Sequence, residues 1–179
     1  EGARLIGLAL GIYGLSQALL QIPLGWLSDR IGRRPVVIGG MLVFALGSFI
    51  AAEASSIEGV LLGRAVQGMG AVSAAVSAWL ADVTRTEVRT TAMAILGVGM
   101  GAAFILALVL GPVLAGVFGV PGLFLLTGVA ALVSLPILVW AVPTGPRLPP
   151  TAGGLRMALS SGILMRLNGG ILVLHATMA

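Results

Sequence analysis

Long apolar runs recur along this 179-residue chain, and they limit what it can fold into more than any other feature. A helix that crosses a lipid bilayer needs about 20 mostly apolar residues. The runs are too long for strands of a soluble sheet, and they lack the alternation of an outer-membrane barrel. We therefore expect an all-α membrane protein with five complete spans and part of a sixth, which begins near Leu159. The complete spans are expected over Leu5–Leu27, Val36–Ala54, Ile57–Leu80, Thr91–Leu114 and Val120–Val142.

The composition agrees with a membrane protein and excludes several functional classes. Hydrophobic residues make up 58% of the chain and charged residues 9%, whereas a soluble domain carries roughly 25% charged residues. So few charges could not cover a soluble globule, which excludes a cytosolic enzyme and a disordered tail. All ten basic residues are Arg, and none lies in a basic stretch interleaved with aromatics, so nucleic acid is not expected as a partner. Cysteine is absent, and we expect neither a metal site nor a cofactor.

The connections between the predicted spans differ in charge on alternate sides of the membrane. The first, third and fifth connections contain most of the Arg residues. Because Arg stays on the cytoplasmic side during insertion, these connections are predicted to be cytoplasmic, and the first span runs inward. We therefore expect a multi-pass protein of the inner (plasma) membrane with one more helix upstream. The Arg residues of these connections are Arg30, Arg33, Arg34, Arg85, Arg89, Arg147 and Arg156.

The connection between the first two spans is the most informative stretch, and it reads Gly-x-Leu-Ser-Asp-Arg-x-Gly-Arg-Arg over residues 25–34. Asp29 lies at the C-terminal end of a predicted helix, where the macrodipole disfavours a carboxylate. Arg33 or the positive N-terminus of another helix must therefore stabilise it. Asp82 has the same position at the end of the third span. We expect a cytoplasmic charge cluster of Asp29, Arg33 and Asp82; the alternative is a topology signal with incidental charges.

Residues 25–34 resemble the signature between helices 2 and 3 of the major facilitator superfamily (MFS). The resemblance implies a fold of twelve helices in two halves, which alternate between inward-open and outward-open states. This chain would then cover family helices 2 to 6 and the start of helix 7. Residues 1–142 would belong to the N-terminal half, 143–158 would form a cytoplasmic linker between the halves, and 159–179 would begin helix 7.

The same resemblance implies a conformational switch at the cytoplasmic face. In the family, the Asp of the signature contacts a helix of the other half and steadies the outward-facing state. That role would fall to Asp29, with Arg33 and Asp82 as relay partners. The switch residues implied by the resemblance are Gly25, Asp29, Arg30, Gly32, Arg33, Arg34 and Asp82.

The third predicted span contains a charged residue, Arg64, about two turns from its start. An Arg at this depth costs several kcal/mol or more unless it is paired or hydrated. No acidic residue lies in the interior of any predicted span, since Glu53 and Glu58 lie at span ends. The counter-charge must therefore come from the rest of the chain, water, backbone carbonyls or substrate. The run also resembles the Arg-x-x-Gln-Gly pattern of MFS helix 4, which implies that Arg64 and Gln67 serve in proton coupling or substrate binding. The alternative is an Arg that snorkels to the outer interface.

Other polar residues are candidates for lining a cavity. Tyr13, Gln17 and Gln21 are spaced four apart and share one face of the first span, which would be costly if it faced lipid. Asn168 and His175 are seven apart and share a face of the last run. His175 can titrate near neutral pH and take part in proton movement. A hydrogen-bonded packing role is the alternative for His175.

The fourth predicted span contains Gly111-Pro112-x-x-x-Gly116, which resembles the core of the MFS antiporter signature in helix 5. The family form has a Gly four residues before Gly111, where this chain has Ala107. Pro112 removes a backbone hydrogen bond and bends a helix, and the two glycines would allow tight contact with another helix. A plain proline kink is the alternative.

A closer resemblance, to the YajR-type subgroup grouped with drug-efflux antiporters, is carried by residues 11–17, 82–87 and 166–175. It implies a secondary transporter that exchanges protons for a small molecule or drug, with a proton gradient as energy source. Its expected partners are the substrate, protons, the lipid bilayer and the rest of its own chain, namely helix 1 and helices 7–12. The alternatives are a metabolite or uptake transporter working by symport or uniport, and a receptor or channel. An enzyme is not expected, because the spans hold no nucleophile paired with a base.

Overall fold

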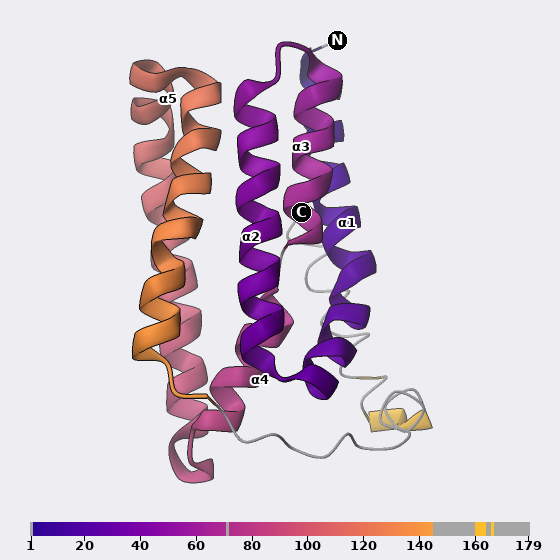
Figure 1. The fold of residues 1–179 in the computed structure, drawn as a ribbon, viewed down its shortest axis with the longest axis vertical. Helices are drawn as coiled ribbons and strands as arrows, with labels where there is room; N and C mark the ends of the chain where they lie inside the picture. Colours follow the sequence, from indigo (N-terminus) through magenta and orange to yellow (C-terminus); the bar gives the residue numbers. More distant parts are fainter. Residues whose placement is uncertain (1, 71, 145–159, 164–165, 167–179) are drawn as a thin grey trace. The chain divides into compact units, whose positions relative to one another are not determined.

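The computed structural model describes residues 2–70, 72–144, 160–163 and 166. The chain divides into two units, Glu1–Leu148 and Pro149–Ala179, and every contact reported below lies within the first. In the described part of that unit all regular structure is helical, as predicted (Figure 1). The elements are α1 (Gly2–Ile31), α2 (Arg33–Glu53), α3 (Ile57–Met69), α4 (Ser73–Val83), the 3-10 helix η1 (Thr86–Val88) and α5 (Arg89–Ala141).

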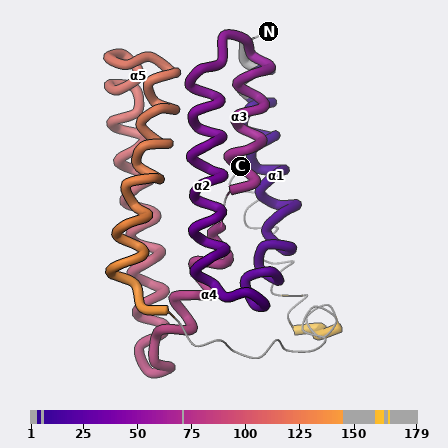
Figure 2. The backbone as a smooth tube through the Cα atoms, viewed as in Figure 1, coloured from indigo at the N-terminus to yellow at the C-terminus, as the bar shows by residue number. Residues whose placement is uncertain are grey.

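Four segments of the described chain are long and apolar enough to cross a membrane: Gly7–Ile31, Arg33–Glu53, Ile57–Val83 and Thr86–Ala141. The last has 56 residues, enough for two crossings at about 20 residues each. It reverses direction at Gly119, whose φ of 68° lies in the left-handed region that favours glycine. Figure 2 shows the two arms of α5 running in opposite directions. The reversal falls inside the connection predicted between the fourth and fifth spans.

The connections lie at two opposite ends of the bundle. Figure 1 shows the α1–α2 connection, the α4–α5 connection and the end of α5 at one end, and the α2–α3 connection and the reversal of α5 at the other. The α1–α2 connection is the single residue Gly32, whose φ of 103° permits so tight a turn. At the opposite end, the Ser56 hydroxyl caps α3 by accepting a hydrogen bond from the Gly59 N–H. The two Arg-rich connections within the described residues therefore share one end, in agreement with the predicted topology.

Helix α2 is the central element, since it contacts α1, α3, α4 and α5. Its closest approach is to α3, through glycines. A Cβ atom on Gly47 would lie 2.7 Å from the Gly63 carbonyl oxygen, and one on Gly63 would lie 2.6 Å from the Ala51 nitrogen. These distances are too short for any side chain, so the two backbones touch directly. Close backbone contact through small residues is the usual way that helices pack within a membrane.

The third span differs from the prediction, because it is two helices rather than one. α3 ends at Met69, and α4 begins at Ser73. The Gly70 N–H bonds back to the carbonyls of Val66 and Gln67, which closes the last turn of α3. Gly70 also lies against the backbone of α2, where a side chain would collide with Phe44. The absence of a side chain at Gly70 allows that contact, and glycine also has a low helix propensity, which favours the end of α3 at this point.

A small apolar core joins α2 to α4. It consists of Val36 and Val37 of α2, Val72 before α4, and Ala75 and Trp79 of α4. The Trp79 residue is only 3% exposed, although it belongs to a short helix. Partly buried side chains from α1 and from the end of α5 pack against this core. The core therefore fixes the helix ends that carry the predicted charge cluster.

We expect Gly47→Ala to lower the free energy of unfolding by about 1–3 kcal/mol, because its new methyl group would overlap the backbone of α3. Gly39→Ala on the same helix is the matched control, since a Cβ there meets nothing within 4 Å in the described part of the chain. The control should be neutral or stabilising by about 0.5–1 kcal/mol. Thermal unfolding in detergent, followed by circular dichroism, measures both. Equal unfolding temperatures for the two variants would contradict the close contact of α2 and α3.

Candidate functional site

The charge cluster, defined as Ser28, Asp29, Arg33 and Asp82, joins the ends of three helices. Asp29 lies near the end of α1, Arg33 is the first residue of α2, and Asp82 lies near the end of α4. A helix end is negative at its C-terminus and positive at its N-terminus. Each of these three charges therefore occupies the helix end that disfavours it, and the ion pairs of Arg33 with the two carboxylates compensate for this.

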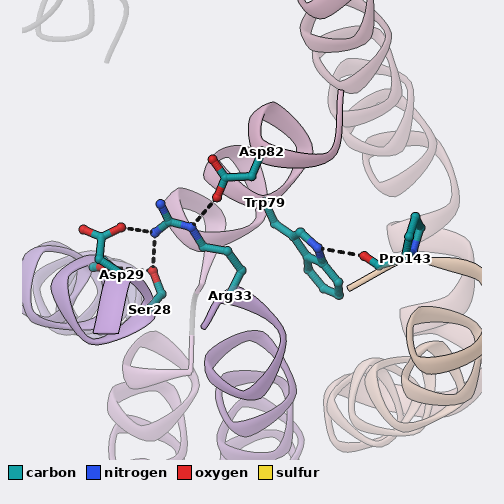
Figure 3. Close-up of polar contacts among 7 residues, drawn as sticks. Ser28, Asp29, Arg33, Trp79, Asp82 and Pro143 are labelled. Atoms are coloured by element: carbon teal, nitrogen blue, oxygen red, sulfur yellow. Dashed lines mark hydrogen bonds and ion pairs between the residues drawn. The ribbon is translucent and has the colours of Figure 1, made fainter. Parts of the chain in front are cut away.

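Arg33 is the centre of the cluster (Figure 3). Its Nη1 lies 2.5 Å from Asp29 Oδ1, and its Nε donates to Asp82 Oδ2 at 2.9 Å. Nη1 also donates to Ser28 Oγ at 2.6 Å, and that hydroxyl donates to the Gly25 carbonyl at 2.7 Å. One guanidinium thus holds two carboxylates and a buried hydroxyl, which ties α1 and α4 to the start of α2.

The two carboxylates differ in their access to water. The Asp29 side chain is 50% exposed, and the Asp82 side chain is 16% exposed. One positive charge shared by two negative charges leaves the three side chains with a net charge of −1. Because water screens an exposed pair more strongly than a buried one, the contact with Asp82 is the firmer of the two. Asp29 is therefore the carboxylate that can take a further positive partner.

The end of α5 is attached beside this cluster. Pro143 has no N–H, so the Val139 carbonyl lacks its helical partner. Nη2 of Arg34 donates to that carbonyl instead. Trp79 Nε1 donates to the Pro143 carbonyl at 3.1 Å (Figure 3). Arg34 follows Arg33 on α2, and Trp79 lies one turn before Asp82 on α4, so the elements that form the cluster also hold the end of α5.

Arg64 lies in a second polar group, on α3. Its Nη1 donates to Gln67 Oε1 at 3.0 Å, and its Nε lies 3.4 Å from the Ala9 carbonyl of α1. The guanidinium also stacks on the Tyr13 ring, 4.4 Å from the ring centroid. Neither of the ion pairs found among the described residues includes Arg64. Its positive charge is therefore held there by uncharged partners.

The other predicted site residues are distributed unevenly. Gln17 and Gln21 are half-buried on α1, but in the described part of the chain they do not join the hydrogen bonds around Arg64. A Cβ at Gly111 or Gly116 would meet nothing within 4 Å among the described residues, and the same holds at Gly25.

The helix continues through Pro112, whereas the non-helical residue inside α5 is Gly119. Asn168 and His175 lie outside the described residues, as do most of the predicted linker and last run. The described residues contain no group of three or more His, Cys, Asp or Glu side chains that could hold a metal ion.

Comparison with known proteins decides the family. The model of the Major Facilitator Superfamily matches residues 2–178, which is nearly the whole chain. The chain belongs to the major facilitator superfamily. This confirms the resemblance carried by residues 25–34, and the family consists of transporters, not enzymes.

Several curated proteins are similar to this MFS chain. It is 46% identical over 177 residues to the inner membrane transport protein YajR of Escherichia coli (strain K12), covering 96% of this chain and 39% of that protein. It is 38% identical over 140 residues to the tetracycline resistance protein, class E, of Escherichia coli, covering 74% and 34% respectively. It is 40% identical over 70 residues to multidrug resistance protein D of Escherichia coli (strain K12), covering 39% and 17%.

The chain thus spans about two fifths or less of the length of these relatives. Its family, its apolar helices and its inner-membrane relative identify it as a multi-pass inner membrane protein.

Sequence reasoning missed three residues of this MFS chain whose buried side chains make polar contacts, namely Ser28, Ser48 and Trp79. Ser48 is fully buried on α2 and accepts a hydrogen bond from Gln67. Trp79 is identifiable in retrospect, because a buried Trp usually finds an acceptor for its indole N–H, which here is the Pro143 carbonyl. Ser48 gave no such signal, since a lone Ser in an apolar helix commonly bonds to its own backbone.

We expect Asp82→Asn to lower the free energy of unfolding by about 1.5–3 kcal/mol, because it removes a charged, largely buried partner of Arg33. Asp29→Asn should cost about 0–1 kcal/mol, since that carboxylate is half exposed. Unfolding of both variants in lipid nanodiscs, at low and high salt, measures the difference. A larger loss for Asp29→Asn would show that the exposed pair carries the cluster.

Proposed function

We propose that the full-length protein is a secondary active transporter that exchanges protons for a small molecule by alternating access. The substrate would bind near the middle of the membrane, between the two halves. The observation that carries the proposal is Arg64, a charge on an apolar span whose described partners are an amide, a backbone carbonyl and an aromatic ring. Charged groups inside membrane spans are rare and usually mark a substrate, ion or proton pathway.

In this proposal, Arg64 and Gln67 serve in proton coupling or substrate binding, and Tyr13 lines the same cavity. Tyr13 supports this role by lying against Arg64. Gln17 and Gln21 extend the cavity along α1, and Asn168 and His175 are proposed to complete it from the last predicted run. The energy source is the proton gradient, and no other cofactor is required. Helix 1 and helices 7–12 of the full-length protein supply the remaining walls.

The charge cluster is proposed to be the conformational switch. Arg33 binds both Asp29 and Asp82, so a change at one carboxylate alters the other contact. Gly25, Arg30, Gly32 and Arg34 complete the signature around it. The half-exposed Asp29 would contact the second half of the transporter in the outward-facing state.

Drug efflux is the substrate class that the relatives favour. The names of two similar proteins refer to tetracycline resistance and to multidrug resistance. Gly111, Pro112 and Gly116 resemble the antiporter signature and give a second reason for antiport. The alternative is a metabolite or uptake transporter working by symport or uniport, because the name of the YajR relative states transport without a substrate.

We expect full-length protein in proteoliposomes to move tetracycline or cationic dyes when a pH gradient is imposed, and Arg64→Ala to abolish this movement. Flux should be lost because the substitution removes the charge within the membrane span that is proposed to take part in proton coupling or to bind substrate. Arg89→Ala is the control, because Arg89 is an exposed Arg at the start of α5. Fluorescence of entrapped dye measures the flux, and reversing the gradient separates antiport from symport. Gradient-driven flux that survives in Arg64→Ala would contradict the role of Arg64, and a lack of flux for every compound would contradict drug efflux.

We expect Asp29→Asn to slow transport about fivefold, the equivalent of roughly 1 kcal/mol of imbalance between the two states, without weakening substrate binding. Dye binding to the detergent-solubilised variant and flux in proteoliposomes measure the two effects separately. Wild-type flux in Asp29→Asn would contradict the switch.

A further inference from the structure

Two buried polar side chains connect the backbone of α2 to Arg64. Ser48 is 0% exposed, and Gln67 is 1% exposed. Arg64 Nη1 donates to Gln67 Oε1 at 3.0 Å, and Gln67 Nε2 donates to Ser48 Oγ at 2.7 Å. Ser48 Oγ in turn donates to the Phe44 carbonyl at 2.9 Å. These three hydrogen bonds form one continuous series, which we call the Ser48 relay.

The chemistry of the end groups fixes the direction of the Ser48 relay. A guanidinium can only donate hydrogen bonds, so Gln67 must present its carbonyl oxygen to Arg64. The amide NH₂ then points the opposite way, towards α2, and needs an acceptor there because a buried N–H without one is costly. Ser48 Oγ is that acceptor, and its own proton is used on the Phe44 carbonyl. Ser48 therefore selects the one amide orientation that can hold Arg64.

The packing of α2 leaves Ser48 little freedom to do anything else. Gly47, the preceding residue, lets the backbone of α3 approach so closely that Gln67 comes within reach. On the α5 side, a Cβ on Gly128 would lie 3.1 Å from Ser48 Cβ. Ser48 is thus enclosed between α3 and α5. Water is not at hand inside a membrane, so its hydroxyl depends on the partners that these helices and α2 supply.

We propose that Ser48 is a positioning residue for Arg64, acting through the orientation of the Gln67 amide. The side-chain hydrogen bonds of Ser48 are with Gln67 and the Phe44 carbonyl, so it acts on Arg64 indirectly. Through these contacts the position of the Arg64 guanidinium is set relative to the backbone of α2. A role in transport rests on the proposed function of Arg64, whereas the positioning itself does not. A structural role confined to α2–α3 packing would leave Arg64 unaffected.

The position of Arg64 can be measured without transport, by the rate at which the arginine reagent phenylglyoxal modifies it. Full-length protein in lipid nanodiscs is treated, and the peptide that contains Arg64 is quantified by mass spectrometry. We expect Ser48→Ala to raise the rate about threefold, the equivalent of one average interhelical hydrogen bond in a membrane. An unchanged rate would overturn the proposal.

The matched control is Ser77→Ala on α4. Ser77 Oγ bonds to the Ser73 carbonyl at 2.9 Å, which is the same bond to the residue four back that Ser48 makes, but without a Gln partner. This variant should leave the rate at Arg64 unchanged. If Ser48→Ala fails to fold, Ser48→Cys replaces it, since a thiol keeps a similar volume but accepts hydrogen bonds weakly.

A double-mutant cycle tests whether the effect passes through Gln67. Gln67→Met removes the amide altogether, so it should raise the modification rate at Arg64, and adding Ser48→Ala should produce no further rise. If Ser48→Ala still raises the rate in the Gln67→Met background, its effect does not pass through the amide, and the proposal is overturned.

Flux measured in the same variants separates this proposal from the proposed function. If modification responds as expected and flux falls in parallel, Ser48 positions a working transport residue. If modification responds while wild-type protein shows no gradient-driven flux, the positioning role stands and the proposed function fails. If flux falls in Ser48→Ala while Arg64 modification stays at the wild-type rate, the positioning role is overturned, and the loss of flux has another cause.

Discussion

The close backbone contact between α2 and α3 is the constraint on which the polar chemistry of this MFS chain depends. Within a membrane no solvent is available to complete a hydrogen bond, so polar side chains must find partners in their own or in neighbouring helices. Gly47 and Gly63 remove the side chains that would hold the two backbones apart. Only at that separation can Gln67 reach Ser48 and still face Arg64. The glycines thus have an electrostatic consequence, because they determine where a positive charge can be held.

Both polar groups are attached to the same helix at different depths. Arg33 is the first residue of α2, and Ser48 lies 15 residues later, which corresponds to about 22 Å along the helix axis. The opposite partners lie on different helices, since Gln67 belongs to α3 and Asp82 to α4. Because α3 ends at Met69 and α4 begins at Ser73, the two partners contact a continuous α2 from separate helices. A rearrangement at the charge cluster therefore need not disturb the Ser48 relay.

The features that the sequence predicts here are those that depend on a single helix and not on how helices pack together. Span positions follow from apolar length, and the charges of Asp29, Arg33 and Asp82 stand out because each occupies an unfavourable helix end. The break at Gly70 could not be predicted, since it depends on how closely α2 passes. Ser48 could not be found either: whether a hydroxyl in an apolar helix meets lipid, its own backbone or another side chain depends on the rotation of neighbouring helices. Pairwise helix packing is the information that a single sequence lacks.

A contact that must form and break in every transport cycle cannot be both buried and strong. Breaking a buried ion pair strands an uncompensated charge and costs about 3–5 kcal/mol, which would trap one state. An exposed pair costs about 0–1 kcal/mol to break, because water replaces the lost partner. Arg33 combines the two regimes in one side chain, with the largely buried Asp82 on one side and the half-exposed Asp29 on the other. Arg33 can therefore stay attached to α4 while it releases Asp29, so the proposed switch needs to dissociate only its weaker half.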